Sequence, residues 1–234
     1  MAGRKLPIRA SLFCTCLTRR AAELGPNAEM RPKLLFDLSE VLIAGLYGIE
    51  HVIAQTASMP PEKIVEVVSG PHLWSLFKGE ITEGEYLTRI LSEGGWQRMD
   101  AAGLSRAMTT LFRAGVAGMP ELVKDLSREC DLYLLSDHAR EWIPSVEAWH
   151  PFLSLFMKRY YSFALGSVKR EGRPFRLVLD DLRIQASEIF FVDDSAANVA
   201  RAREHGIEAT VFQGRSTLEP QLNAWIRRRR GGPA

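Results

Sequence analysis

Four short segments of this sequence place acidic, hydroxyl or lysine side chains directly after apolar runs or in the loops that follow them. They are Asp37 in the run Lys33–Leu38, Ser136 and Asp137 at the end of Asp131–Ser136, Lys169 after Gly166-Ser167-Val168, and Asp193-Asp194 after Glu188–Val192, with Asn198 one turn later. A carboxylate at a strand end can attack phosphorus and form an aspartyl-phosphate. A hydroxyl and a lysine can hold the transferred group, and paired aspartates can hold Mg²⁺, which prefers oxygen ligands. Together the segments indicate metal-assisted phosphoryl transfer, which depends on positioning and charge stabilisation.

Each segment alone also has an ordinary structural explanation. A single aspartate after an apolar run is typical of a turn or a helix cap, and a single Ser136 or Lys169 is typical of a solvated loop. Asp193-Asp194-Ser195 could simply begin a helix, where the dipole favours acids. The order and spacing of all four segments are what favour a reactive site.

These segments resemble the four motifs of the haloacid dehalogenase (HAD) superfamily, over about residues 33–213. The resemblance implies that Asp37 is the nucleophile, that Ser136 and Asp137 bind substrate, and that Lys169 stabilises both the nucleophile and the phosphoryl group. It also implies a Mg²⁺ site made by Asp37, the Ser39 carbonyl and Asp194, with Asp193 beside it and Asn198 supporting it. The implied activity is a Mg²⁺-dependent phosphohydrolase acting on a small phosphorylated metabolite.

Ser39 departs from this pattern, because the family has a second aspartate there that serves as general acid and base. A serine hydroxyl cannot protonate a leaving group as a carboxylic acid can, and losing that role costs roughly 10²–10⁴-fold for poor leaving groups. Glu40, next to it, or His138, after the second motif, could supply the proton instead. We therefore expect a phosphatase that acts on good leaving groups or uses another acid. The alternatives are a non-catalytic protein that binds a phosphate ligand or a partner, and a dehalogenase-like hydrolase, which the acidic pair disfavours.

The segments that position these residues predict an α/β fold with a Rossmann-like parallel sheet. Strand and helix patterns alternate from residue 131 onward, whereas a helical block separates the first strand from the others. We expect an HAD-like core at residues 33–46 and 116–226, a helical cap at 47–115, a flexible extension at 1–32 and a basic tail at 227–234. Ligands of open parallel sheets bind at the carboxyl ends of the strands, where the four segments lie.

The cap is expected to select the substrate, although the sequence does not identify which substrate that is. Its aromatic residues are Trp74, Phe77, Tyr86 and Trp96, of which most are expected to pack between helices and one or two to line the pocket. His72 and Arg113 are further candidates for the pocket.

Composition narrows the class of protein further. The net charge of +2 is too small to indicate nucleic-acid binding, and no apolar run approaches the roughly 18 residues of a membrane span. The three cysteines favour a reducing compartment over a disulfide framework. We expect a cytoplasmic enzyme whose partner is a small molecule; the oligomeric state is not predicted. Residues 1–29 are basic and poor in acids, so an organellar transit peptide is the alternative, as is a translation start at Met30.

Overall fold

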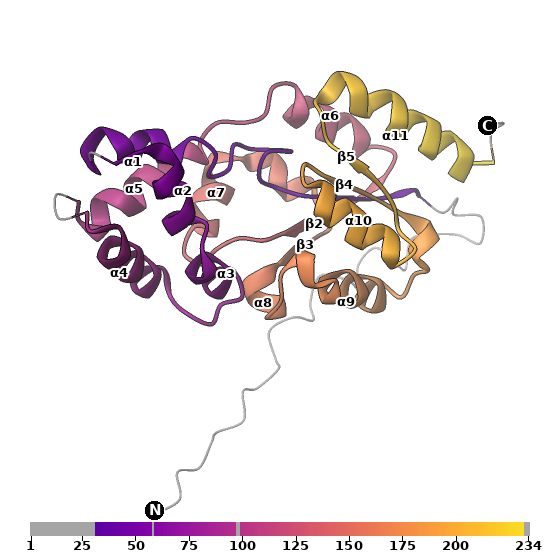
Figure 1. Ribbon diagram of the computed structural model, residues 1–234. Coiled ribbons are helices and arrows are strands. Elements are labelled where there is room, and N and C mark those ends of the chain that lie inside the picture. The colour runs from indigo at the N-terminus through magenta and orange to yellow at the C-terminus, as the bar shows by residue number, and fades with distance from the viewer. Residues whose placement is uncertain (1–30, 58, 97–98, 232–234) are drawn as a thin grey trace, which may run out of the picture. The chain divides into compact units, whose positions relative to one another are not determined.

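In the computed structural model, which describes residues 31–57, 59–96 and 99–231, a five-stranded sheet forms the centre of residues 32–231 (Figure 1). The strands are β1 (Lys33–Phe36), β2 (Asp131–Ser136), β3 (Lys158–Tyr161), β4 (Ile189–Asp193) and β5 (Glu208–Val211). They run parallel in the order β3-β2-β1-β4-β5, so the strand that precedes Asp37 is central. This confirms the predicted Rossmann-like α/β fold.

The register of the sheet brings the ends of the strands to one edge. Phe36 pairs with Leu134 of β2 and with Val192 of β4, so Asp37 lies level with Asp193. The backbone N–H of Asp37 donates to the carbonyl of Val192 at 2.8 Å, which continues the ladder one residue beyond β1. Three of the four predicted segments therefore meet at the carboxyl ends of the strands.

Both faces of the sheet are covered by helices. Alternate strand residues point to opposite sides, and apolar side chains on each side pack against helices. Leu35 and Phe191 pack with α9 (Arg173–Leu182) and α10 (Ala196–Glu204). Leu34 and Phe36 belong to the other core, with α6 (Met119–Leu126), α7 (Ile143–Trp149) and α11 (Arg215–Arg229). Shorter elements connect these layers: α8 (Ser162–Leu165) and the 3₁₀ helices at Pro151–Leu155, Lys169–Glu171 and Ala186–Glu188.

Among the described residues between β1 and α6 there are five consecutive helices, which we call the helical block. They are α1 (Ile49–Ala57), α2 (Pro61–Val68), α3 (Pro71–Phe77), α4 (Glu83–Gly94) and α5 (Ala101–Leu111). Their starts follow from the sequence. Pro61 and Pro71 occupy first turns, and Thr82 forms a capping box with Glu85. Figure 1 shows the block gathered to one side of the sheet.

One boundary differs from those predicted, at the C-terminal end of the core. The third strand ends at Tyr161, where Ser162–Leu165 turns into α8, which stops at Gly166, whose φ is +63°. Helix α11 continues through Arg229, so residues 227–229 are helical rather than part of a tail. Arg228 pairs with Glu208 at 2.6 Å, which ties this last turn to β5.

The expectations for residues 1–30, including the transit peptide and the alternative start at Met30, lie outside the described residues. Within the part of the chain that the structure describes, no helix has both the length and the apolarity needed to cross a membrane.

Candidate active site

The carboxylate of Asp37 is fixed at the end of the central strand. Its side chain is buried, and its Oδ1 accepts a 2.7 Å hydrogen bond from the backbone N–H of Leu38. Lys169 Nζ lies 2.7 Å from the same oxygen. Because both donors use Oδ1, the described contacts leave Oδ2 available for a ligand or a reaction.

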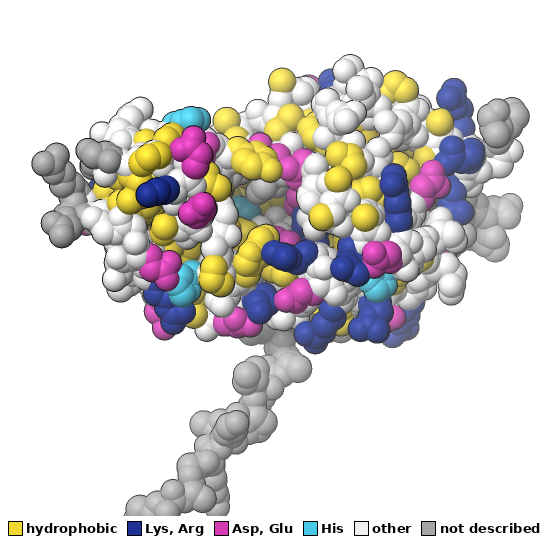
Figure 2. All heavy atoms as spheres, in the orientation of Figure 1, with side chains coloured by type: hydrophobic (Ala, Val, Ile, Leu, Met, Phe, Trp, Pro, Cys, Tyr) yellow, Lys and Arg dark blue, Asp and Glu magenta, His cyan; other side chains and the backbone are white. Residues whose placement is uncertain are grey.

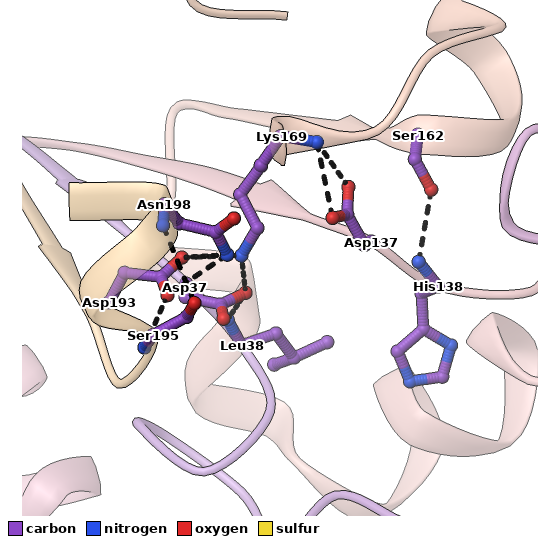
Figure 3. Close-up of polar contacts among 9 residues, drawn as sticks. All are labelled: Asp37, Leu38, Asp137, His138, Ser162, Lys169, Asp193, Ser195 and Asn198. Atoms are coloured by element: carbon purple, nitrogen blue, oxygen red, sulfur yellow. Dashed lines mark hydrogen bonds and ion pairs between the residues drawn. The ribbon is translucent and has the colours of Figure 1, made fainter. Parts of the chain in front are cut away.

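Lys169 contacts the other three predicted segments, so all four meet at this residue. Its Nζ also lies 2.6 Å from Asp193 Oδ2, while its backbone N–H donates to the Asp137 carboxylate at 3.1 and 3.2 Å (Figure 3). The lysine side chain is only 2% exposed, which is unusual for this residue type outside an ion pair. Asp137 thus fixes the backbone of Lys169, while the ammonium group of Lys169 lies between Asp37 and Asp193.

Both carboxylate oxygens of Asp193 already accept hydrogen bonds from neighbouring groups. Its Oδ1 accepts from the Ser195 N–H at 2.8 Å and from Asn198 Nδ2 at 3.1 Å, and its Oδ2 accepts from Lys169. Ser195 also caps α10, as predicted, which sets the position of Asn198 on the first turn. Asp194, in contrast, is half-buried and lines the pocket described below.

The charges of the cluster do not balance. Burial raises the pKa of Asp37 well above its ordinary value, although Lys169 opposes that shift. Burial and the neighbouring Asp193 also raise the pKa of Asp194. Burial alone would lower the pKa of Lys169, but Asp193, Asp37 and Asp137 together raise it. One ammonium therefore faces more carboxylates than it can neutralise.

This donor set fits a divalent cation. One carboxylate oxygen from each of Asp37, Asp193 and Asp194 lies within 4.8 Å of the others. Hard ions such as Mg²⁺ take oxygen ligands, usually from one or two carboxylates plus waters and a phosphate. Since Asp193 is already occupied by donors, Asp37 and Asp194 are the carboxylates with the most free coordination capacity.

The segment after Asp37 turns sharply at Glu40. Its φ of +61° is a left-handed conformation that is costly for a residue with a side chain. Glu40 Oε1 accepts from the Gly45 N–H at 2.7 Å, and a Cβ at Gly45 would lie 2.6 Å from that oxygen. Ser39 and Glu40 both line the pocket, so the turn presents the two side chains beside Asp37 and Asp194.

Ser136 ends β2 as predicted, but its side chain is fully buried and is not part of the pocket lining. Its Oγ has no hydrogen-bond partner among the described residues. Its neighbour Asp137 lines the pocket but is engaged by the backbone of Lys169, and burial raises the pKa of Asp137 to about 6.

His138, which the sequence offered as a possible proton donor, is buried among aromatic rings. Its ring contacts those of Phe77, Phe112 and Trp142, and burial lowers the pKa of the imidazole to about 4. The ring is therefore neutral at pH 7, so it has no imidazolium proton to donate. Figure 3 shows the ring pointing away from the cluster around Lys169.

A pocket of about 690 Å³ opens between these strand ends and the helical block, and Figure 2 shows the hollowed face. Trp74 and Phe77 line it, whereas Tyr86 and Trp96 are buried in the core of the block. His72 and Arg113 are absent from its described lining. His72 pairs with Glu93, and Arg113 lies over Trp149.

Several lining residues were not singled out from the sequence. They are Leu46, Tyr47, Glu50, Phe112, Trp142, Arg170 and Arg201. Arg170 follows Lys169 directly, so its proximity to the motif was a usable signal. Tyr47 and Phe112 lie at the two ends of the predicted cap, where the chain must cross the mouth of the site.

Comparison with known proteins supports the same arrangement. No protein-family model matches the chain. Flavin mononucleotide hydrolase 1 of the Arabidopsis thaliana chloroplast is 23% identical over 222 residues, which cover 94% of this chain and 87% of the relative.

Solved structures agree over most of the chain. A predicted HAD-like family hydrolase from Porphyromonas gingivalis has a TM-score of 0.70 and 21% identity, over 85% of this chain and 98% of that one. A HAD family enzyme from Bacteroides thetaiotaomicron, solved in complex with magnesium and inorganic phosphate, has a TM-score of 0.65 and 23% identity, over 79% and 95%. The chain therefore has the fold of the haloacid dehalogenase-like hydrolases that its motifs resemble.

Proposed function

We propose that this protein is a Mg²⁺-dependent phosphohydrolase that acts on a small phosphorylated metabolite through an aspartyl-phosphate on Asp37. The observation that carries the proposal is the convergence of Asp37, Lys169 and Asp194 at one edge of the sheet, beneath a pocket. The relative named as a flavin mononucleotide hydrolase and the neighbour solved with magnesium and phosphate support it.

Asp37, Asp194 and the Ser39 carbonyl would hold the Mg²⁺, with Asp193 beside them. The bound ion would supply positive charge to the phosphoryl oxygens and to the two carboxylates. Asn198 and Ser195 hold Asp193, and Asp193 in turn holds Lys169, so this inner network positions the lysine rather than the substrate.

In the first step Asp37 Oδ2 attacks phosphorus, the Oδ2–P bond forms and the ester P–O bond breaks. Lys169 and the Leu38 N–H keep Oδ1 in place and balance charge while this happens. The unpartnered hydroxyl of Ser136 would donate to a phosphoryl oxygen after a small movement, which accounts for a buried polar group without a bond. Water then hydrolyses the acyl phosphate, releasing inorganic phosphate and restoring the carboxylate.

The leaving oxygen must take a proton or depart as an anion. Ser39 stands where the resemblance requires an acid, and His138 is neutral, so neither supplies a proton readily. We therefore assign the protein to substrates with good leaving groups. The helical block would act as the cap that closes over the pocket and selects among them.

Ser39 also favours a second candidate, a non-catalytic protein that binds a phosphate ligand. The dehalogenase alternative is disfavoured, because halide displacement needs no metal and would leave the excess of carboxylates around Asp194 without a use.

A phosphatase panel with Mg²⁺ separates the two candidates. Aryl phosphates and acyl phosphates come first on the panel, because they have good leaving groups. Flavin mononucleotide, nucleotides and sugar phosphates, whose phosphate is carried by an alkyl alcohol, follow. We expect turnover by the wild type and a loss of at least roughly 10³-fold in Asp37→Asn, the scale of removing a nucleophile. Asp181→Asn, which alters a surface carboxylate paired with Lys158, is the matched control and should retain activity. Equal, negligible rates in the wild type and Asp37→Asn would support the binding protein.

A further inference from the structure

The pocket has a charged end and an aromatic end. The charged end contains Asp37, Lys169 and Asp194. The other end, which we call the aromatic subsite, is lined by five ring-bearing residues from the helical block and from the loop after β2: Trp74, Phe77, Phe112, His138 and Trp142. Leu46, Ile49, Val65, Val68 and Leu73 add aliphatic surface from the same side.

The rings of the aromatic subsite form a continuous wall. Trp74 and Phe77 meet edge to face with centroids 6.2 Å apart, and Phe77 lies nearly parallel to His138 at 6.5 Å. Phe112 contacts both His138 at 5.0 Å and Trp142 at 5.2 Å. Trp74 and Phe77 are the half-buried members, so they present ring surface to the pocket, whereas Phe112 and Trp142 are buried behind them.

Residues that are adjacent in the sequence connect the charged end of the pocket to the aromatic subsite. The Arg170 guanidinium lies 4.8 Å from the centre of the Trp74 ring, and Arg170 directly follows Lys169. On the other side, His138 directly follows Asp137, which binds the backbone of Lys169. A molecule whose phosphate contacts Lys169 would therefore extend its organic part along these rings.

His138 supplies a poorly satisfied polar group to this wall. The ring is 1% exposed, neither Nδ1 nor Nε2 makes a hydrogen bond of good geometry with the described residues, and only the backbone of Ala139 interacts weakly with it. Its ring neighbours cannot satisfy it, since the one indole N–H nearby, Trp142 Nε1, donates to Glu83 at 2.7 Å. Burying a polar group without a partner is costly, and such groups in native proteins usually serve a ligand or a water.

We propose that the aromatic subsite binds a flat, uncharged aromatic ring system in the organic part of the substrate, with Trp74 and Phe77 stacking on the ring and His138 hydrogen-bonding to a heteroatom on its edge. The proposal rests on the proposed function for the presence of a phosphate at the charged end. Sugar phosphates fit poorly, because their hydroxyl groups would lose water and face rings that offer few hydrogen bonds.

Binding of phosphate-free aromatic compounds tests the subsite without any reaction. The probes are 7-hydroxycoumarin, which carries a lactone on a bicyclic ring, and 2-naphthol, which has a similar shape without it. Equilibrium binding to the full chain is measured by fluorescence and calorimetry. We expect both probes to bind, and Trp74→Leu to weaken both by about tenfold, the scale of one lost stacking contact.

Trp149→Leu is the matched control for Trp74→Leu. Trp149 is also a half-buried tryptophan beneath an arginine, Arg113, at 5.3 Å, but it is not in the pocket lining. This variant should bind both probes as the wild type does. Absence of binding to the wild type, or equal losses in the two tryptophan variants, would overturn the proposal.

His138→Phe isolates the hydrogen bond while keeping an aromatic ring in the wall. We expect 7-hydroxycoumarin to bind about tenfold more weakly, as for the loss of one buried hydrogen bond, while binding of 2-naphthol stays within about twofold. If His138 had a purely structural role, His138→Phe would change the affinity for both probes equally, and that result would remove His138 from the proposal.

The enzymatic panel then distinguishes the two proposals. Ring binding that depends on Trp74, together with no hydrolysis of any phosphate ester, would refute the proposed function and support the aromatic subsite. Hydrolysis that depends on Asp37 but favours sugar phosphates over aromatic phosphates of similar leaving-group pKa would support the function and refute the aromatic subsite.

Discussion

Lys169 Nζ lies 2.7 Å from Asp37 Oδ1 in the interior of the protein, although Asp37 directly follows β1 and Lys169 lies between β3 and β4. The pair is stable there because Asp193 holds the same ammonium at 2.6 Å. Removing one partner of a buried ion pair leaves an uncompensated charge, which costs more than the pair itself contributes. The structure thus links the reactive carboxylate to the stability of the fold.

Lys169→Met should destabilise the protein by roughly 3–5 kcal/mol and abolish activity, because Asp37 and Asp193 lose their shared cation. Urea unfolding followed by circular dichroism measures the change. Lys158→Met is the control. Lys158 pairs with Asp181 at the surface, so its loss should cost at most about 1 kcal/mol. A similar loss in the free energy of unfolding of both variants would show that the buried ion pairs of Lys169 matter no more to stability than a surface pair.

Mg²⁺ should stabilise the folded protein. An ion that binds only the native state adds about 2.7 kcal/mol at one hundred times its dissociation constant. Thermal unfolding in increasing Mg²⁺ or Mn²⁺ should show a rising Tm in the wild type and little rise in Asp194→Asn, which loses the least occupied carboxylate of the cluster. An unchanged Mg²⁺ response in Asp194→Asn would place the ion elsewhere.

His138 should make the protein sensitive to mild acid. Burial lowers the pKa of His138 from 6.5 to about 4, so between these values the unfolded chain binds a proton that the folded chain does not. Stability is therefore lost as the pH falls from 6.5 towards 4, by about 3 kcal/mol from this group. His138→Phe should remove that part of the pH dependence, measured by urea unfolding at pH 7 and pH 4.5.

The control for His138→Phe is His51→Phe, since the side chain of His51 is 72% exposed. It should follow the wild-type pH dependence. If His138→Phe also follows it, the imidazole is not held neutral by the fold, and its place in the aromatic wall would need another explanation.

The sheet and the strand-end residues could be predicted from the sequence because the signals are local. Apolar runs closed by Asp37, Ser136 and Asp193 predict strands and, in a parallel sheet, a common edge. The pairing of Lys169 with Asp193 could not be predicted, since it depends on how the loop before α9 folds back over β4. Spacing along the sequence carries no information on that path.

Residues whose role depends on packing were the hardest to interpret. His138 follows the second motif, so its position suggested solvent or catalysis, but Phe77 and Phe112 arrive from the helical block and bury it. Among the aromatic residues predicted for the cap, Trp74 and Phe77 line the pocket while Tyr86 and Trp96 do not. Helical spacing alone does not separate these pairs, because Trp74, Phe77 and Tyr86 all lie on helices and Trp96 lies just after one. The left-handed turn at Glu40 carried no sequence signal, since glycine usually marks such a turn.

Ser39 leads to the last prediction, because it lines the pocket where a carboxylic acid would assist the leaving group. The wild type should hydrolyse aryl and acyl phosphates and be slow with simple alkyl phosphates, so kcat/KM should fall steeply as the leaving-group pKa rises. Ser39→Asp should speed alkyl phosphates selectively, by up to about 10²-fold. The gain is limited because a further carboxylate beside Asp37 and Asp194 repels phosphate. A shallow dependence in the wild type would mean that another group already donates the proton, and Glu40, which follows Ser39 and also lines the pocket, is the first candidate.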